Sequence, residues 1–342
     1  TSTPLLLGTG LQHGSLTYLI REKNMSKKAQ NELNKLDEAA RAGWMYYVGG
    51  KTQDEIAKTL KTSRQSAQRL VALSMSEGLV KVRLEHPIAR CMELAQGLRE
   101  KFGLTFCDIV PNVDDDPNST QGLGQAGAAA IERALKHDAP QTIAFGTGRV
   151  LRACADELSL LHCPQHKIVS LVGNIAENGE ATRYDVAVHV ADRLKAQHYP
   201  MPTPVIASSE EERDVWHQQK HISRIHSLAE QADISFVGIG NLGSVSPLYK
   251  DGFIDDDELG ILADSGACGE IISWVFNEEG ALIKCDINQR VTSVKLKATP
   301  EKPVIGIAAG DNKFNAIRGA LRSKFLNGLI TTERTASALL DA

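Results

Sequence analysis

Apolar residues recur along the first part of the chain with the spacing of one face of a helix. The pattern is clearest from Lys35 to Val48. A repeat of three to four residues is typical of an amphipathic helix, so we expect a helix over 35–48. The residues predicted to form its buried face are Leu36, Ala39, Ala40, Trp44, Tyr47 and Val48.

Two shorter helices are predicted after this one. Thr52 followed by Glu55 is a capping box, which places a helix start at Thr52. Ser63 is the expected N-cap of the next helix, and only Lys61 and Thr62 separate the two. The residues expected to face inward are Ile56, Ala57 and Leu60 in the first of these helices, and Ala67, Leu70, Val71, Ser74 and Met75 in the second.

The last of these helices begins with hydrogen-bonding side chains. A short turn before such a helix is typical of a helix-turn-helix, in which arginine pairs with guanine, glutamine with adenine, and hydroxyls reach phosphates. After Gly78, apolar and basic residues alternate as in the strand of a wing, with Lys81 and Arg83 on its outer face. We therefore expect a winged helix-turn-helix over 35–85. The candidate DNA contacts are Thr52, Ser63, Arg64, Gln65, Ser66, Gln68, Arg69 and Lys81.

Local charge favours this interpretation. Residues 51–83 carry seven basic and three acidic side chains, a balance of +4 within a chain whose net charge is −4. The net charge argues against a chain that is basic throughout, so nucleic-acid contact must come from such a local patch. The alternative is a solvated helical hairpin with an ordinary mixed surface.

From about Cys91 onward, short apolar runs alternate with longer helical stretches. This alternation is typical of a parallel sheet with helices on both faces. We therefore expect a doubly wound, Rossmann-like α/β domain over 101–342, preceded by a linker helix over 86–100. The runs expected to be strands are FCDIVPNV, QTIAFGTG, HKIVSLVGN, PTPVIAS, ISFVGIGN and KPVIGIAAG.

Three of these runs end in glycine and should cluster, because ligands of such sheets bind at the carboxyl ends of the strands. Arg149 and Lys313 could each hold an anionic or hydroxylated ligand there, although an isolated basic residue is more often a surface or salt-bridge residue. The first loop lacks the third glycine of a dinucleotide fingerprint, so NAD is disfavoured and no cofactor is expected. The strand-end candidates are Gly146, Thr147, Gly148, Arg149, Gly240, Asn241, Asp311 and Lys313.

A further candidate is Glu270. It follows two glycines in the run SGACGE over 265–270 and precedes the apolar IISWVF. We expect a tight loop that directs this carboxylate into a cavity, where it would accept hydrogen bonds from hydroxyls.

Metal chemistry is not expected. His162, Cys163 and His166 offer three zinc ligands, but a structural zinc site needs a fourth. The acidic run over 255–258 is expected to be a solvated turn, because no glycine-spaced calcium loop surrounds it.

The composition indicates a cytoplasmic protein. The six cysteines are scattered without a Cys-x-x-Cys pair, so reduced thiols are expected. No apolar run approaches the roughly 18–20 residues that span a bilayer. Residues 1–34 are expected to be a tail. Within it, Met25 opens an ordinary start, so 1–24 are expected to be a vector remnant or upstream extension, with a disordered native tail as the alternative.

Taken together, the chain from Leu36 to Leu340 resembles the SorC/DeoR-type family of bacterial sugar-responsive transcriptional regulators. The matching stretches are AARAGWMYYVGGKTQDEIAKTLKTSRQSAQRLV, ADISFVGIGNLGSVSPLYKDGFI, GACGEIISWVF and VIGIAAGDNKFNAIRGALRSKFLNGLITTERTASALL. The resemblance implies an effector domain similar to sugar-phosphate isomerases and deaminases, here used for sensing. It also implies an effector pocket lined by the loop from Gly146 to Arg149, by Glu270 and by Lys313.

One position departs from the family pattern. Many relatives that bind phosphosugars carry a threonine where this chain has Val150. A missing hydroxyl weakens a phosphate site, so we hypothesise an unphosphorylated sugar or polyol as effector, while Arg149 keeps the phosphate alternative open.

The implied mechanism is a homodimer or homotetramer that binds operator DNA through paired winged helices and changes its operator affinity with the effector. The alternative is a sugar-phosphate isomerase or deaminase with an appended DNA-binding segment, in which Glu270 and Lys313 would be the acid and base.

Overall fold

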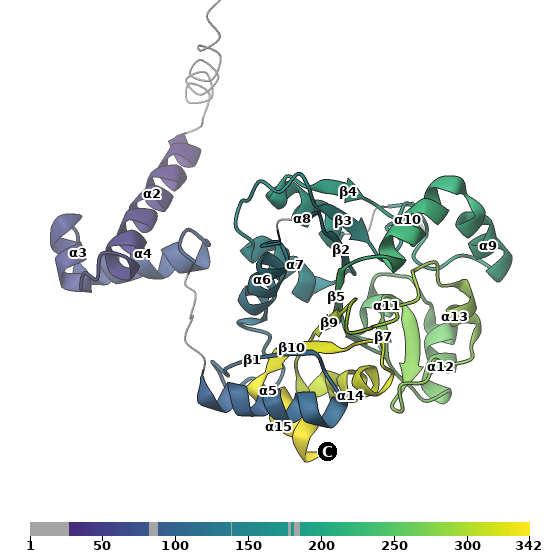
Figure 1. The fold of residues 1–342 in the computed structure, drawn as a ribbon. Helices are drawn as coiled ribbons and strands as arrows, with labels where there is room; N and C mark the ends of the chain where they lie inside the picture. Colours follow the sequence, from purple (N-terminus) through teal and green to yellow (C-terminus); the bar gives the residue numbers. More distant parts are fainter. Residues whose placement is uncertain (1–26, 82–87, 138, 177–178, 181–184) are drawn as a thin grey trace, which may run out of the picture. The chain divides into compact units, whose positions relative to one another are not determined.

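The computed structural model describes residues 27–81, 88–137, 139–176, 179–180 and 185–342. The chain divides into two compact units, Thr1–Leu84 (unit 1) and Glu85–Ala342 (unit 2), which are considered separately (Figure 1).

The described part of unit 1, residues 27–81, contains three packed helices: α2 (Lys27–Tyr47), α3 (Gln53–Thr59) and α4 (Arg64–Ser76). The Thr52 side chain accepts from the Glu55 amide and the Glu55 carboxylate accepts from the Thr52 amide, so the predicted capping box is confirmed. The Ser63 hydroxyl accepts from the Ser66 amide, which confirms the second cap. The buried core of unit 1 contains Ala42, Ile56, Ala57, Ala67 and Val71.

The predicted inner face of the first helix is wrong in part. Trp44 and Val48 are 60% and 68% exposed, whereas Ala39, Ala42 and Gly43 are buried. The reason is close helix packing: a Cβ added at Gly43 would lie 2.3 Å from the Ser74 hydroxyl of α4. Only small residues fit at such a contact, so the bulky side chains lie on another face. Tyr47 and, on α4, Met75 were also predicted to face inward and are exposed.

The predicted wing strand does not begin where expected. The amides of Leu79 and Val80 both donate to the Ser74 carbonyl, so the chain bends at these two residues, and residues 79–81 form no strand. The rest of the predicted wing, including residue 83, lies outside the described residues.

Unit 2 is built on a parallel sheet, which has seven strands in the described residues. The order is β1-β10-β9-β5-β2-β3-β4, and each neighbouring pair is parallel. The strands are β1 (Phe106–Val110), β2 (Thr142–Phe145), β3 (Lys167–Ser170), β4 (Gln197–Tyr199), β5 (Ile234–Gly238), β9 (Val304–Ile307) and β10 (Gly328–Thr332).

Five of the six predicted strands are found in the structure. The prediction of a strand over PTPVIAS is wrong. This segment makes only isolated bridges, from Pro204 to Ile175 and from Ile206 to Val291. Prolines at 202 and 204 lack the amide hydrogens that a ladder needs, which explains the difference. Strands β4 and β10 were not predicted: β4 has only three residues, and β10 is a short strand buried along its whole length.

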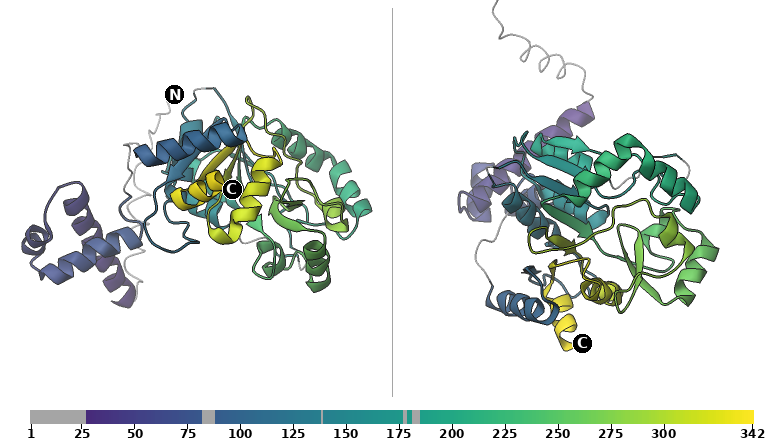
Figure 2. Two further views of the ribbon diagram at one scale, coloured as in Figure 1. Left: turned by 90° about the horizontal axis from the view of Figure 1, so that it is seen from below. Right: turned by 45° about the vertical axis from the view of Figure 1, so that its right-hand side comes forward.

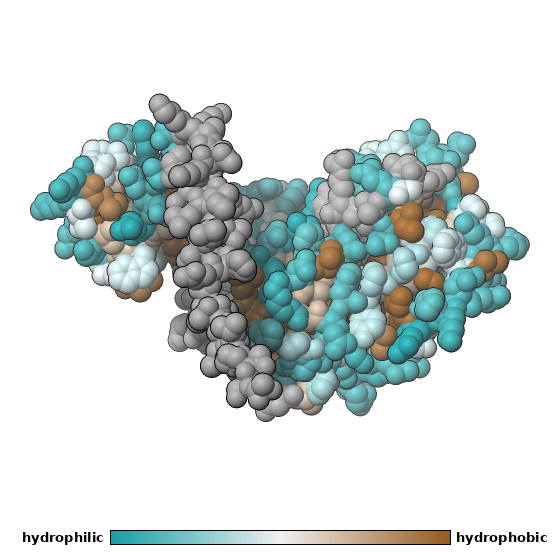
Figure 3. Space-filling model, turned by 90° about the horizontal axis from the view of Figure 1, so that it is seen from above, coloured by the Kyte–Doolittle hydropathy of each residue, from teal (hydrophilic) through white to brown (hydrophobic). Residues whose placement is uncertain are grey.

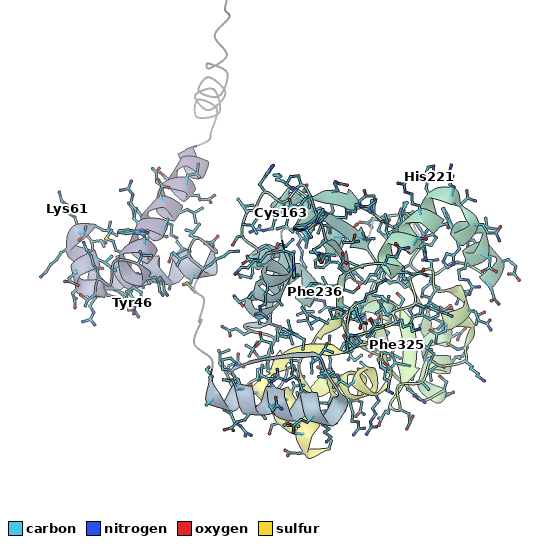
Figure 4. The ribbon with its side chains drawn as sticks, viewed as in Figure 1. Tyr46, Lys61, Cys163, His221, Phe236 and Phe325 are labelled. Carbon is cyan, nitrogen blue, oxygen red and sulfur yellow. The ribbon has the colours of Figure 1, made fainter. Side chains whose placement is uncertain are left out.

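Helices cover both faces of the sheet (Figures 1 and 2). One hydrophobic cluster includes residues of α6, α7 and α8, and the other includes residues of α5, α10, α14 and α15. Phe145 and Phe236 stack in the first cluster, and Figure 4 labels Phe236. The helices are α5 (Ala89–Phe102), α6 (Leu123–Ala134), α7 (Arg149–Glu157), α8 (Val186–Leu194), α9 (Glu210–Gln218), α10 (Lys220–Glu230), α14 (Phe314–Arg322) and α15 (Glu333–Asp341).

The helix expected as a linker is α5, and it packs within unit 2. It buries Cys91, Leu94 and Leu98 in the same cluster as α15 residues. The Lys101 ammonium donates to the Leu340 carbonyl of α15 at 2.9 Å. Helix α5 is therefore part of the sheet's outer layer.

A small antiparallel sheet, β6 (Gly240–Asn241), β7 (Ala267–Ile271) and β8 (Trp274–Asn277), lies beside α11 (Pro247–Lys250), α12 (Asp256–Asp264) and α13 (Asp286–Arg290). The acidic run predicted as a solvated turn caps α12: the Asp255 carboxylate accepts from the Glu258 amide, and Glu258 forms an ion pair with Arg290.

Polar and apolar residues mix over the molecular face drawn in Figure 3. Within the described residues, no helix combines the length and apolar character needed to cross a bilayer.

Asn288→Ala is predicted to destabilise unit 2. The buried Asn288 amide accepts from the Val275 amide and donates to the carbonyls of Val275 and Ile283. Its loss removes the partner of the Val275 amide and of the Ile283 carbonyl, while the Val275 carbonyl still accepts from the Ile283 amide. We expect a loss of about 3 kcal/mol in the free energy of unfolding, measured with urea. The neighbouring exposed Gln289→Ala is the control, and equal losses from the two variants would contradict the prediction.

Candidate functional site

The glycine-ended strands meet at one edge of the sheet. Strand β5 lies between β9 and β2, and all three are parallel, so their carboxyl ends are adjacent as predicted. A cavity of about 520 Å³ opens at this edge. Its lining comprises Thr147, Gly148, Arg149, Gly173, Ala176, Glu180, Val205, Gly238, Pro247, Leu248, Lys250, Asp251, Gly252, Phe253, Glu270, Ile272 and Ser273.

The loop between β2 and α7 forms one wall of this cavity. Three of its predicted residues, Thr147, Gly148 and Arg149, are lining residues. Gly148 is the N-cap of α7 with φ of 122°, a conformation that favours glycine. The first turn of α7 therefore begins at the cavity, where unpaired amides can donate to a ligand oxygen. Gly146 is buried beneath the lining.

Glu270 also lines the cavity, but it lies in a strand and not in the predicted tight loop. It lies in strand β7 and pairs with Gly240 of β6. Its Oε2 accepts from the Ser273 amide at 2.8 Å. Burial raises the pKa of the Glu270 carboxyl, while the Ser273 hydrogen bond and the positive charge of Lys313 partly oppose that rise.

Lys313 is close to Glu270 electrostatically but is not a lining residue. Its ammonium donates to the Ile239 carbonyl at 2.7 Å. Burial lowers the pKa of Lys313, the negative charge of Glu270 raises it, and the positive charge of Arg149 lowers it further. Lys313 therefore acts on the cavity through charge, because its donor contact is with the backbone between β5 and β6.

The other predicted ligand residues lie outside the lining. Gly240 and Asn241 form β6, where they pair with Glu270 and Gly269. A Cβ added at Gly240 would lie 2.0 Å from Glu270 Oε1, so this glycine makes room for the carboxylate. Asp311 is exposed and forms an ion pair with Arg334 at 2.8 Å.

Sequence reasoning missed much of the cavity wall. The segment from Pro247 to Phe253, with α11, supplies six lining residues, and the β7–β8 turn supplies Ile272 and Ser273. None of these carries a motif. Leu248 is held in the core beside the small sheet, so its position depends on tertiary packing. Two signals were available: the segment from Pro247 to Phe253 falls within the family-matching stretch that ends at residue 254, and Gly243 before it and Gly252 within it both adopt positive φ.

Charges of both signs line the cavity. The basic lining residues are Arg149 and Lys250, and the acidic ones are Glu180, Asp251 and Glu270. A fully charged phosphate dianion is favoured by a surplus of basic groups, which the described residues of this lining do not provide. The mixture suits a ligand that presents several hydroxyls.

The candidate DNA contacts in unit 1 fall into two groups. Gln65, Gln68 and Arg69 are exposed on α4, and Arg64 forms an exposed ion pair with Asp54 at 3.5 Å. The hydroxyls of Thr52, Ser63 and Ser66 are engaged in the caps of α3 and α4. Lys81 is exposed beyond the last helix of unit 1.

Within the part of the chain that the structure describes, no cluster of three or more histidine, cysteine or acidic side chains could hold a metal ion. The cysteines are free thiols, and burial raises the pKa of Cys107 and Cys154 to about 12.

Residues 86–341, nearly all of unit 2, match the family described as "Putative sugar-binding domain". The chain is also 31% identical over 302 residues to the erythritol catabolism regulatory protein EryD of Brucella abortus, covering 88% of this chain and 96% of that protein. The chain belongs to the SorC/DeoR-type family of sugar-binding transcriptional regulators.

Other relatives of this regulator agree with the assignment. It is 28% identical over 308 residues to the sorbitol operon regulator of Klebsiella pneumoniae, covering 86% of this chain and 95% of that protein. The crystal structure of the full-length sorbitol operon regulator SorC from the same organism covers 90% of this chain and 99% of its own, with a TM-score of 0.64 at 24% identity. A DeoR family regulator from Listeria monocytogenes gives a TM-score of 0.65 at 22% identity, covering 73% of this chain and 99% of that one. These structures share the fold.

Gly240→Ala is predicted to displace the Glu270 carboxylate. The new Cβ would meet Oε1 at 2.0 Å, so the carboxylate or the β6–β7 pairing must shift. We expect a loss of about 1–3 kcal/mol in the free energy of unfolding. The control is Gly260→Ala on α12, where an added Cβ meets nothing within 4 Å and helix propensity favours alanine. If both variants are at least as stable as the unchanged chain, the prediction fails.

Proposed function

We propose that this regulator binds operator DNA through a winged helix-turn-helix in unit 1 and that a sugar or polyol in the cavity of unit 2 controls its operator affinity. The observation that carries the proposal is the cavity itself. It lies at the carboxyl ends of parallel strands in the domain that matches the sugar-binding family, and it is lined by the predicted loop and by Glu270.

The DNA-binding part of the proposal rests on α3 and α4. A short turn separates them, and the exposed polar start of α4 presents Arg64, Gln65, Gln68 and Arg69. Such side chains at the N-terminal end of a recognition helix pair with base edges in the major groove. The Arg64–Asp54 ion pair is exposed, so it costs little to exchange for a base or phosphate contact.

For the effector, we propose an unphosphorylated polyol or sugar. Among the described residues, the lining has three acidic groups against two basic ones, and Val150 in the first turn of α7 offers no hydroxyl. Val150 is not a lining residue and packs in part against the cluster beneath α7, and its Cγ1 lies 3.9 Å from a Cβ built at the lining residue Gly238. Two relatives are named for the catabolism of erythritol and for a sorbitol operon, and both of those compounds are polyols.

The proposed mechanism is linkage between the two sites. Two or four copies would bind half-sites, and the effector would favour one arrangement of the effector domains. Operator affinity would then change by the effector's differential binding free energy, typically about 1–3 kcal/mol. The direction of the change is left to experiment.

A catalytic role for the cavity has less support. Lys313, one of the two acid/base candidates for an isomerase or deaminase, donates to the Ile239 carbonyl and is not a lining residue. The relatives are named as regulators. Turnover of pentose or hexose phosphates by the purified chain would favour the enzyme instead.

The central experiment is selection of operator sequences from random DNA at fixed salt, with and without a panel of sugars, polyols and their phosphates. A palindromic site whose affinity changes with one compound is the expected result. No enrichment above non-specific binding would remove the DNA-binding proposal.

Arg64→Ala is predicted to weaken operator binding. If Arg64 reads a base, the loss is about 1–3 kcal/mol and discrimination at one base pair relaxes. If it contacts phosphate, binding weakens on all sequences alike and the salt dependence decreases. Fluorescence anisotropy on the selected operator and its single-base variants separates the two. Arg224→Ala, an exposed arginine of α10, is the control, and an equal effect from both variants would contradict the prediction.

Val150→Thr is predicted to shift ligand preference toward phosphates. The unchanged regulator should bind a free polyol more tightly than its phosphate ester. The added hydroxyl should strengthen binding of the phosphate by about tenfold, the value of one charge-assisted hydrogen bond. Isothermal titration calorimetry of the unchanged regulator and of the variant, with D-sorbitol and with D-sorbitol 6-phosphate, measures these dissociation constants. If the unchanged regulator binds the phosphate ester more tightly than the free polyol, the polyol assignment is wrong.

A further inference from the structure

The turn between β7 and β8 has a backbone that its residues do not favour. Ile271 pairs with Trp274, so Ile272 and Ser273 form a two-residue hairpin loop. Both have positive φ, 45° and 71°. This is the geometry of a hairpin turn that normally uses Asn-Gly, and a β-branched residue at such a position is an outlier. Local preference does not explain this turn.

The turn lies at the cavity and is closely packed. Ile272 and Ser273 are 5% and 4% exposed, and both are lining residues. The Ser273 amide donates to the Glu270 carboxylate. On the other side, Ile272 approaches the loop before α7: a Cβ added at Gly146 would lie 3.0 Å from Ile272 Cγ2. One strained dipeptide therefore touches both walls of the cavity.

The surrounding structure holds the turn in place. The Trp274 indole donates to the Val294 carbonyl, and Asn288 pairs with both backbone groups of Val275. The Gly146 amide donates to the Phe236 carbonyl, which anchors the opposite loop to β5. Strained backbone that is held from several sides in this way is concentrated at ligand sites, where it sets geometry before the ligand arrives.

We propose that Ile272 is a positioning residue for effector binding. Its Cγ2 methyl fixes the Gly146–Gly148 loop relative to Glu270, so that the α7 amides and the carboxylate are spaced for one ligand. The left-handed turn is retained because it brings the Ser273 amide to Glu270 and the branched side chain to Gly146 at once. This inference rests on the proposed function of the cavity.

Two conservative variants test the role of the branch. Ile272→Val keeps the Cγ2 methyl but is smaller, whereas Ile272→Leu keeps the volume but moves the branch away from Cβ. Both substitutions are mild enough for a core to accept. If the position of the branched methyl matters, Ile272→Leu weakens effector binding more. If only the side-chain volume matters, Ile272→Val weakens it more.

The first measurement needs no ligand. Hydrogen exchange of the full chain should show the Gly146 amide exchanging about tenfold faster in Ile272→Leu, equivalent to about 1.4 kcal/mol of lost protection. Ile272→Val should stay near the rate of the unchanged chain. Lys195→Gly is the matched control, because Lys195 also has a positive φ but lies at the end of α8, outside the cavity lining. It relieves backbone strain and should leave the Gly146 amide unchanged.

The second measurement is calorimetric titration with erythritol and, separately, with D-sorbitol. We expect a dissociation constant about tenfold weaker for Ile272→Leu, which is 1.4 kcal/mol at the usual conversion, and near-original binding for Ile272→Val. Equal behaviour of the two variants in both measurements, or a larger effect from Val, overturns the positioning role. If exchange changes as expected but the unchanged chain binds neither polyol, the proposed effector class fails, whereas the effect of Ile272 on the Gly146 loop is supported.

Discussion

The cavity depends on a carboxylate placed in a poorly hydrated position. Burying Glu270 costs solvation free energy, and unit 2 offsets this cost with a hydrogen bond from the Ser273 amide and with the positive charge of Lys313. Gly240 leaves space for one carboxylate oxygen. These partners come from the β7–β8 turn (Ser273), from the segment after β9 (Lys313) and from β6 (Gly240). A ligand that meets Glu270 therefore meets a group that is oriented before binding.

The same constraint joins the two sheets. Strand β5 of the parallel sheet ends at Gly238. Two residues later, Gly240 begins the small antiparallel sheet, where it pairs with Glu270. The short distance between these glycines means that the carboxyl edge of the parallel sheet and the carboxylate-bearing strand cannot move independently. The pocket wall on the other side starts at Gly148, the N-cap of α7. Backbone geometry, rather than a dense set of side-chain charges, therefore shapes this site.

In unit 1, the helix caps could be predicted from the sequence, but the buried face of α2 could not. The caps at Thr52 and Ser63 were predicted correctly because a cap is a contact between residues three apart. The buried face of α2 was predicted wrongly, because the contact between Gly43 and Ser74 selects small residues and turns Trp44 outward. Hydrophobicity marks a residue as apolar, but the distance between two helix axes decides whether it fits.

The sequence by itself determined the alternation of strands and helices, the helix starts, and the meeting of three glycine-ended strands, because each follows from local spacing and from the parallel order of the sheet. It also marked Gly148, Arg149 and Glu270. Only the tertiary structure decided the rest of the site. In the folded chain, Asp311 forms an ion pair with Arg334, whereas Phe253 and Ile272 line the cavity. Those placements depend on contacts between segments far apart in the chain, whose energies no short pattern of residues records.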